Sequence, residues 1–200
     1  MTRWIAAALL LACASLAVDR FASGRPIARG PGVVAAREPA QRQLGRDAPV
    51  FAKEGFRVAA LASFEMEARV LRAKNYCCGG PDRLAPVDVA FGWGRMSDEA
   101  VLARIDVAQS GRFYFWRYEG SPPIPHWEIE HSSANMHLIP ATKTMEKRLR
   151  NLRPGNVVAL RGYLVDVQGE GGFRWTSSLT REDTGSGACE LIWVEELEVS

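Results

Sequence analysis

The chain has 200 residues, of which 47% are hydrophobic and 24% are charged, so global disorder is excluded and a folded core is expected. The formal net charge is only +2, too small for the basic face of a nucleic-acid-binding domain, so nucleic acid is excluded as a partner. This length accommodates one domain of ordinary size together with a tail.

An apolar run near the N-terminus predicts an export signal or a membrane anchor. Arg3 precedes an uninterrupted run of apolar and small residues from Trp4 to Val18. A helix of this length extends about 22 Å, short of the ~30 Å hydrocarbon core, which favours a signal segment. Three outcomes stay open: cleavage after small residues, lipidation of Cys13 in the lipobox-like sequence LLAC, and retention as a short anchor. We therefore assign residues 1–18 to a signal peptide or an N-terminal anchor, with the membrane as partner.

The composition of residues 19–49 predicts a flexible linker. Four prolines, four glycines and six arginines interrupt any periodicity there, and large apolar residues are few. We expect this segment to hold a folded head away from the membrane. Residues 50–200 are then expected to form a single β-rich globular domain.

A strict alternation opens the expected domain. From Phe56 to Val70 every even-numbered residue is apolar, which predicts a half-buried strand even though the alanines and glutamates favour helix. A loop rich in glycine and proline, CCGGPDRLAPVD, follows it. Ser97 is a good N-cap residue and predicts a short helix that carries Leu102 and Ile105.

The next segment, RFYFWRY at 112–118, predicts a strand with aromatic side chains on both faces. Tyr114, Trp116 and Tyr118 share one face and are candidate binding residues, because such a platform can stack on sugar rings or bases. The alternative is a central strand buried on both faces, since aromatic residues are common core material.

The rest of the chain predicts one further helix among strands. Thr142 to Leu152 has an apolar stripe and ends before Pro154-Gly155, as a helix would. Strands are expected over 127–130, 135–139, 156–167, 173–179 and 189–199. The sum is an α+β fold dominated by antiparallel strands with two short helices, for which a small OB-like Greek-key barrel is one arrangement.

All three histidines lie between residues 126 and 137, which raises the question of a metal site. The helical zinc motif H-E-x-x-H is absent. A metal-assisted hydrolase would need His126, His131 and His137 to converge with Glu128 or Glu130 around an open coordination position. The competing interpretation is that Asn135 and His137 bind backbone groups in an irregular buried connection, where they are also candidate ligand-binding residues.

The remaining cysteines are candidates for one disulfide. Cys77 and Cys78 are adjacent and could pair with each other only through a strained backbone. In an oxidising compartment either could bridge to Cys189. The spacing lacks the C-x2-C zinc knuckle, and we predict no cofactor.

Several stretches together carry a resemblance: FGWGRMSD, RFYFWRYEG, ANMHLIPA, GYLVDV and TREDTGSGACELIWVE. They resemble a group of small bacterial proteins of unknown function that have an N-terminal hydrophobic segment. The resemblance covers roughly 56–196, implies a single envelope-associated domain and transfers no catalytic residue. We expect a periplasmic or cell-envelope, membrane-tethered binding or structural domain rather than an enzyme, with an envelope protein or a glycan as ligand. The metal-assisted hydrolase is the alternative.

Overall fold

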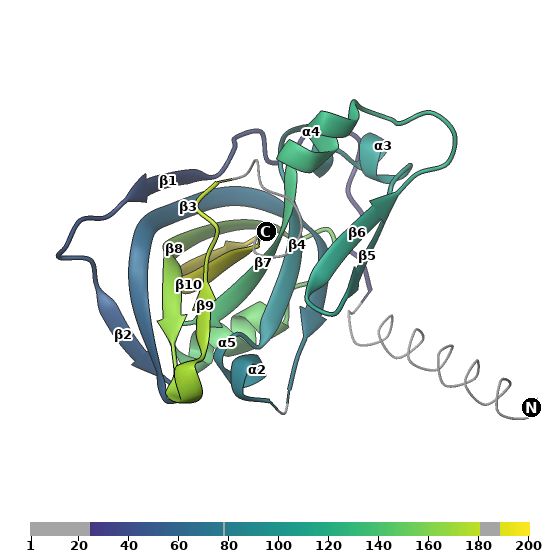
Figure 1. Ribbon diagram of the computed structural model, residues 1–200. Helices are drawn as coiled ribbons and strands as arrows, with labels where there is room; N and C mark the ends of the chain where they lie inside the picture. The colour runs from purple at the N-terminus through teal and green to yellow at the C-terminus, as the bar shows by residue number, and fades with distance from the viewer. Residues whose placement is uncertain (1–24, 78, 181–188) are drawn as a thin grey trace, which may run out of the picture.

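Five strands of the computed structural model pair in a closed circuit (Figure 1). The model describes residues 25–77, 79–180 and 189–200. In the order of pairing, the circuit consists of β3 (Phe56–Asn75), β4 (Val87–Gly92), β7 (Ser133–Pro140), β10 (Glu190–Val199) and β8 (Val157–Gln168), which pairs again with β3. All neighbours are antiparallel except β7 and β10, which are parallel. The circuit is therefore a small barrel, and the strand-dominated α+β prediction is confirmed.

The long strand β3 supplies the alternation seen in the sequence. Its even-numbered side chains from Ala62 to Val70 are buried in the central apolar cluster. The pairing with β4 shifts between Val70 and Arg72, and beyond this irregularity Leu71 packs in a different cluster while Ala73 returns to the central one. The strand predicted from alternation is thus confirmed, and it continues to Asn75. Such a bulge bends a strand, and this bend lets β3 follow the barrel wall.

The interior of the barrel is apolar. All five strands contribute to the central cluster, through residues such as Phe64, Phe91, Met136, Leu160 and Ile192. Helix α5 (Lys143–Arg150) adds Met145 and Leu149 to the same cluster, and the Thr142 side chain caps its first turn by accepting from the Met145 N–H at 3.0 Å. This is the second helix predicted from the sequence. Each fully buried large apolar side chain contributes about 1.5–3 kcal/mol to the free energy of folding through removal of its surface from water, so this cluster is what stabilises the barrel.

An insertion between β4 and β7 packs against the outside of the barrel. Its elements are the 3₁₀ turn η1 (Gly94–Ser97), α3 (Glu99–Leu102), the hairpin strands β5 (Asp106–Ser110) and β6 (Phe113–Arg117), and α4 (His126–His131). A second apolar cluster joins them to the barrel: Leu71, Ala90, Met96, Ile105, Val107, Ile124 and Ile129. Figure 1 shows the hairpin on the right of the barrel.

Two local predictions in this insertion are wrong. The cap of α3 is Asp98, whose side chain accepts from the Ala100 N–H, because the Ser97 hydroxyl accepts instead from backbone N–H groups of residues 34 and 35. Residues 127–130, predicted as a strand, belong to α4, which follows Pro125 and buries only Ile129. So short a segment has too few apolar residues to distinguish a period of two from a period of 3.6.

The described part of the expected linker, residues 25–49, packs along the domain. The Ile27 N–H donates to the Pro154 carbonyl at 2.8 Å, and Ala35 is buried. Strand β1 (Ala40–Gln43) then pairs with β3. The prediction of a flexible linker is wrong here because backbone hydrogen bonds, which composition does not reveal, hold the segment in place.

The remaining elements of the described chain are short. They are β2 (Val50–Lys53), which forms a hairpin with β3, α2 (Gly80–Leu84), the 3₁₀ turn η2 (Glu170–Gly172), and β9 (Arg174–Thr176), which pairs with β8. Helices α2 and α4 are additional to the two predicted. Within the described ranges no helix is long and apolar enough to cross a membrane. Residues 1–18, predicted to be a signal peptide or an anchor with Cys13 as a lipidation candidate, lie outside the described residues.

Candidate binding site

The outer face of β4 and β7 carries a buried polar pair. Residues of these strands that point into the barrel are apolar, and strand alternation turns Asp88 and His137 to the opposite face. The two residues are direct partners in the β4–β7 register, and Nδ1 of His137 lies 2.9 Å from Oδ1 of Asp88. The Asp88 side chain is fully buried and that of His137 is 5% exposed. A carboxylate and an imidazole thus meet where solvent is nearly excluded.

Arg112 brings a positive charge to this pair from the tip of the β5–β6 hairpin. Its guanidinium donates to Asp88 Oδ1 at 2.7 Å and to Asp82 Oδ1 of α2 at 2.7 Å. The guanidinium carbon also lies 4.2 Å from the ring centre of Tyr76 and 5.2 Å from that of Trp175. Charge-assisted hydrogen bonds and cation–π contacts therefore both fix this side chain.

The backbone conformation of Arg112 is unfavourable for any residue with a side chain. Gly111 and Arg112 form the two-residue loop of the hairpin, with φ of 56° and 68°. Positive φ at both positions is typical of a type I′ turn, whose second position strongly prefers glycine. An arginine in this position is stabilised by the contacts of its side chain rather than by the turn.

Further hydrogen bonds attach the hairpin tip to β7 and to the end of β3. The Asn135 side chain donates to the Arg112 carbonyl at 3.0 Å and accepts from the Gln109 side chain at 2.7 Å. The Arg112 N–H donates to the Tyr76 hydroxyl at 3.2 Å. Asn135 does bind backbone as predicted, but the irregular connection expected around Asn135 and His137 is wrong, because both lie within the regular strand β7.

The cluster has an excess of hydrogen-bond acceptors. Asp82 and Asp88 face one arginine, and Oδ2 of Asp88 is buried without a hydrogen-bond partner among the described residues. Burial, together with the negative charge of Asp88, raises the pKa of Tyr76, so its phenol stays neutral. The ring of Trp175, half-buried, lies 4.9 Å from the imidazole of His137. We define the Arg112 cluster as Tyr76, Asp82, Asp88, Arg112, His137 and Trp175.

The aromatic strand is oriented differently from both interpretations of the sequence. Tyr114, Trp116 and Tyr118 share a face as predicted, but they pack against the second apolar cluster, which joins the insertion to the barrel, and the Tyr114 hydroxyl lies 3.1 Å from the Ser133 hydroxyl. Phe113 and Phe115 on the opposite face are 43% and 56% exposed. The strand is part of a two-stranded hairpin, so burial of both faces in a central strand is also wrong.

The residues of the predicted metal site do not converge. His126 contacts the Tyr118 hydroxyl, and Nδ1 of His131 lies 2.7 Å from the Trp127 carbonyl oxygen. His137 is on β7, and Glu128 pairs with Arg95. No three His, Cys, Asp or Glu side chains gather as potential metal ligands in the part of the chain that the structure describes. The prediction fails because the first two histidines lie on the short helix α4 and the third on a strand.

The disulfide stays a prediction. Cys77 is exposed at the end of the β3 segment and forms no disulfide, whereas Cys78 lies outside the described residues. Cys189 is half-buried directly before β10.

Sequence reasoning found His137, and Asn135 beside the cluster, but missed the other five members of the Arg112 cluster. One signal was present: Asp88 interrupts the otherwise apolar strand VDVAFG, and a charged residue in such a strand is rarely buried without a partner. Arg112 gave no such signal, because the positive φ of its turn is visible only in the structure. No protein-family model, curated protein or solved structure matches the chain, so the meaning of the cluster has to be argued from its geometry.

Proposed function

We propose that the chain is an exported, membrane-tethered binding domain of the bacterial cell envelope, and that its ligand contacts the Arg112 cluster. The observation that carries the binding role is a cluster of two carboxylates, one arginine and two half-buried aromatic rings, on the outside of a barrel whose interior is apolar. Burying charged groups costs free energy, and clusters of buried charges are common at functional sites.

The position of the cluster supports a barrel of the OB type. Domains of that type bind oligosaccharides and oligonucleotides on the face of their second and third strands and on the loops after strands one and four. In the circuit described above, β4 and β7 are the second and third strands. The connection after β3 carries Asp82, and the connection after β8 carries Trp175. The Arg112 cluster thus combines the three surfaces that such a barrel uses.

The chemistry of the cluster favours a glycan. The Asp82 carboxylate, which is 28% exposed, can accept a hydrogen bond from a hydroxyl or an amide, and the half-buried rings of Tyr76 and Trp175 offer faces for stacking. Phosphate is disfavoured because Arg112 is already engaged by two carboxylates. Outside the cytosol, polymers of amino sugars meet these requirements.

Sedimentation of the full-length chain in detergent with purified peptidoglycan tests the proposal. We expect Trp175→Ala to weaken binding at least about tenfold, which corresponds to ~1.4 kcal/mol, and Trp175→Phe to retain much of it. Trp127→Ala is the matched control, because Trp127 is 63% exposed on α4 and outside the Arg112 cluster.

Two results would contradict the proposal. Equal binding of peptidoglycan by the Trp175→Ala and Trp127→Ala variants would show that the glycan does not bind at the Arg112 cluster. Recovery of the intact chain from the cytosol, unattached to a membrane, would contradict the proposed role in the cell envelope.

A further inference from the structure

We propose that the β5–β6 hairpin forms a second contact with the membrane, through the outer face that carries Phe113, Phe115 and Ala108. The inference rests on the proposed tethering and adds to it an orientation of the domain. The occupant of this face is the lipid bilayer to which the N-terminal segment is attached.

The first observation is the exposure of two adjacent aromatic side chains. Phe113 and Phe115 are two residues apart on β6, so both point to the same side of the hairpin, and they are 43% and 56% exposed. Ala108, which is directly opposite Phe115 in the register, is exposed on the same face. Phenylalanine side chains of this kind insert into the boundary between lipid headgroups and acyl chains.

The second observation is the place where the described chain begins. Residues 26–28 line a shallow surface hollow together with Asp106 and Val107 at the start of β5. The N–H of Ile27 and the side chain of Arg29 fix this segment by donating to the carbonyls of Pro154 and Gly155, each at 2.8 Å. The tether therefore reaches the domain beside the hairpin.

The connection between the apolar run and this point is short. The run ends at Val18, and six residues separate it from Arg25. The seven Cα-to-Cα steps from Val18 to Arg25 span at most about 25 Å when fully extended, which is less than the diameter of a domain of this size. The side of the domain that carries the hairpin must therefore stay close to the bilayer.

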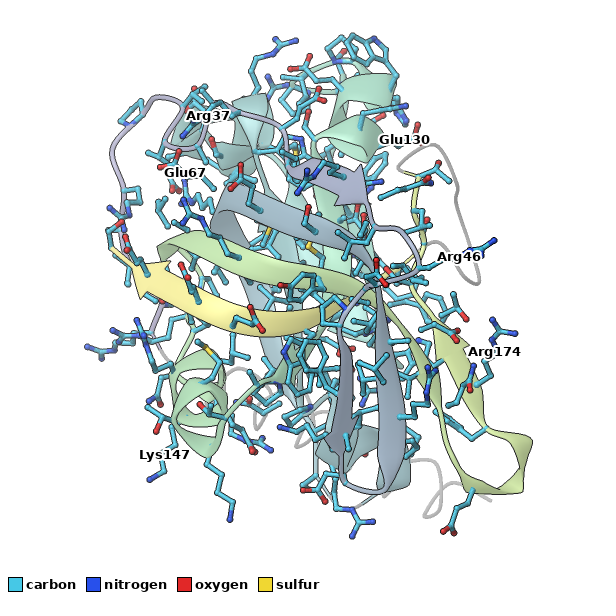
Figure 2. The ribbon with its side chains drawn as sticks, turned by 90° about the vertical axis from the view of Figure 1, so that its left-hand side faces the viewer. Arg37, Arg46, Glu67, Glu130, Lys147 and Arg174 are labelled. Atoms are coloured by element: carbon cyan, nitrogen blue, oxygen red, sulfur yellow. The ribbon has the colours of Figure 1, made fainter. Side chains whose placement is uncertain are left out.

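The third observation is the charge on the opposite side of the barrel. A hollow of about 370 Å³ beside β1 is lined by five glutamates against two arginines: Glu38, Glu65, Glu67, Glu196 and Glu198, with Arg37 and Arg161. Figure 1 shows β1 on the left of the barrel and the hairpin on the right, and Figure 2 views the acidic side with Arg37 and Glu67 labelled. Anionic lipid repels this acidic side. An orientation with the hairpin toward the bilayer therefore also keeps the acidic side away from it.

The hairpin is also held firmly enough to present its outer face. Arg112 at the tip is bonded to Asp88 and Asp82, and the Arg72 side chain donates to the Val107 carbonyl at 2.7 Å. At the other end of the hairpin Arg117 pairs with Asp106 at 2.7 Å. The two phenylalanines are thus displayed by a fixed element rather than by a loose loop.

Photocrosslinking in vesicles tests the inference. The full-length chain would carry benzoylphenylalanine in place of Phe115, or in separate samples of Phe113, and be reconstituted with phosphatidylethanolamine and acyl-labelled phosphatidylglycerol. The matched control is the same replacement of Val50, which is 52% exposed on β2, on the side of the barrel away from the hairpin (Figure 1). Flotation of the vesicles on a density gradient reports tethering separately.

We expect the chain to float with the vesicles and the Phe115 position to form at least tenfold more lipid adduct than the Val50 position. Flotation without a lipid adduct at either phenylalanine would overturn the inference and leave the tethering intact. An adduct to a second copy of the chain would also overturn it, because the face would then be a protein interface. Failure to float would overturn the tethering in the proposed function, and the inference with it.

Discussion

Replacing Arg112 by glycine separates two opposite contributions of this residue to the free energy of unfolding. Its φ of 68° lies in the left-handed region, where a residue with a side chain costs about 1–2 kcal/mol relative to glycine. If Arg112 served only as a turn residue, Arg112→Gly would raise the unfolding free energy by about this amount.

The contacts of the guanidinium act in the other direction. Asp88 is fully buried, and Arg112 is its charge partner at 2.7 Å. Removing one partner of a buried ion pair costs about 3–5 kcal/mol, because the other charge is left without compensation. After subtraction of the relief in the turn, we expect a net loss of about 1–4 kcal/mol. The sign of the change therefore decides whether the side chain or the turn dominates.

Urea unfolding of the full-length chain in detergent, followed by tryptophan fluorescence, measures this difference. Glu54→Gly is a matched control, because Glu54 and Gly55 form the corresponding two-residue loop between β2 and β3, with φ of 52° and 82°. The Glu54 side chain lies 4.0 Å from that of Arg83, and because both are exposed this contact contributes little. We expect Glu54→Gly to be neutral or stabilising by up to about 1 kcal/mol. If Arg112→Gly is also stabilising, the argument for the Arg112 cluster is refuted.

Two further substitutions test the barrel itself. A Cβ atom on Gly162 would lie 1.8 Å from the carbonyl oxygen of Trp193, so Gly162→Ala should lower the free energy of unfolding by about 3 kcal/mol or more, as measured by heat or urea. Gly45 has open space around it, so the control Gly45→Ala should change that free energy by no more than about 0.5 kcal/mol. Equal effects of the two substitutions would refute the close approach of β8 and β10. Burial raises the pKa of Asp166, but hydrogen bonds, chiefly from Thr176 and Arg174, outweigh burial and hold the pKa below its ordinary value. The stabilising contribution of the Asp166 carboxylate is therefore complete above about pH 4 and is lost as the pH falls through the folded-state pKa. The difference in unfolding free energy between the wild type and Asp166→Asn should then shrink below about pH 4. A difference that stays constant from pH 6 to pH 3 would contradict this prediction.

Local pattern predicted the elements of the fold better than their arrangement. The alternation from Phe56 defined β3 correctly against the helix propensity of its alanines, because burial of one face in the barrel outweighs propensity. Thr142 and the apolar stripe after it defined α5. The parallel pairing of β7 with β10 could not be predicted, because it joins residues as far apart as His137 and Leu191. No local pattern encodes such a pairing.

The same limit applies to the candidate site. The clustering of histidines drew attention to His137, but the residue lies beside Asp88 because of the β4–β7 register and not because of the other histidines. The aromatic pattern showed correctly which side chains share a face of β6. It did not show which of the two faces points to the barrel, because both are aromatic.

The position of β10 between β7 and β8 has a consequence for the order of assembly. Both neighbours keep an unpaired edge until residues 190–199 join them, so the barrel stays open while the preceding strands are already present. Pairing between such distant segments is slow, so we expect closure of the barrel by β10 to be a late step of folding.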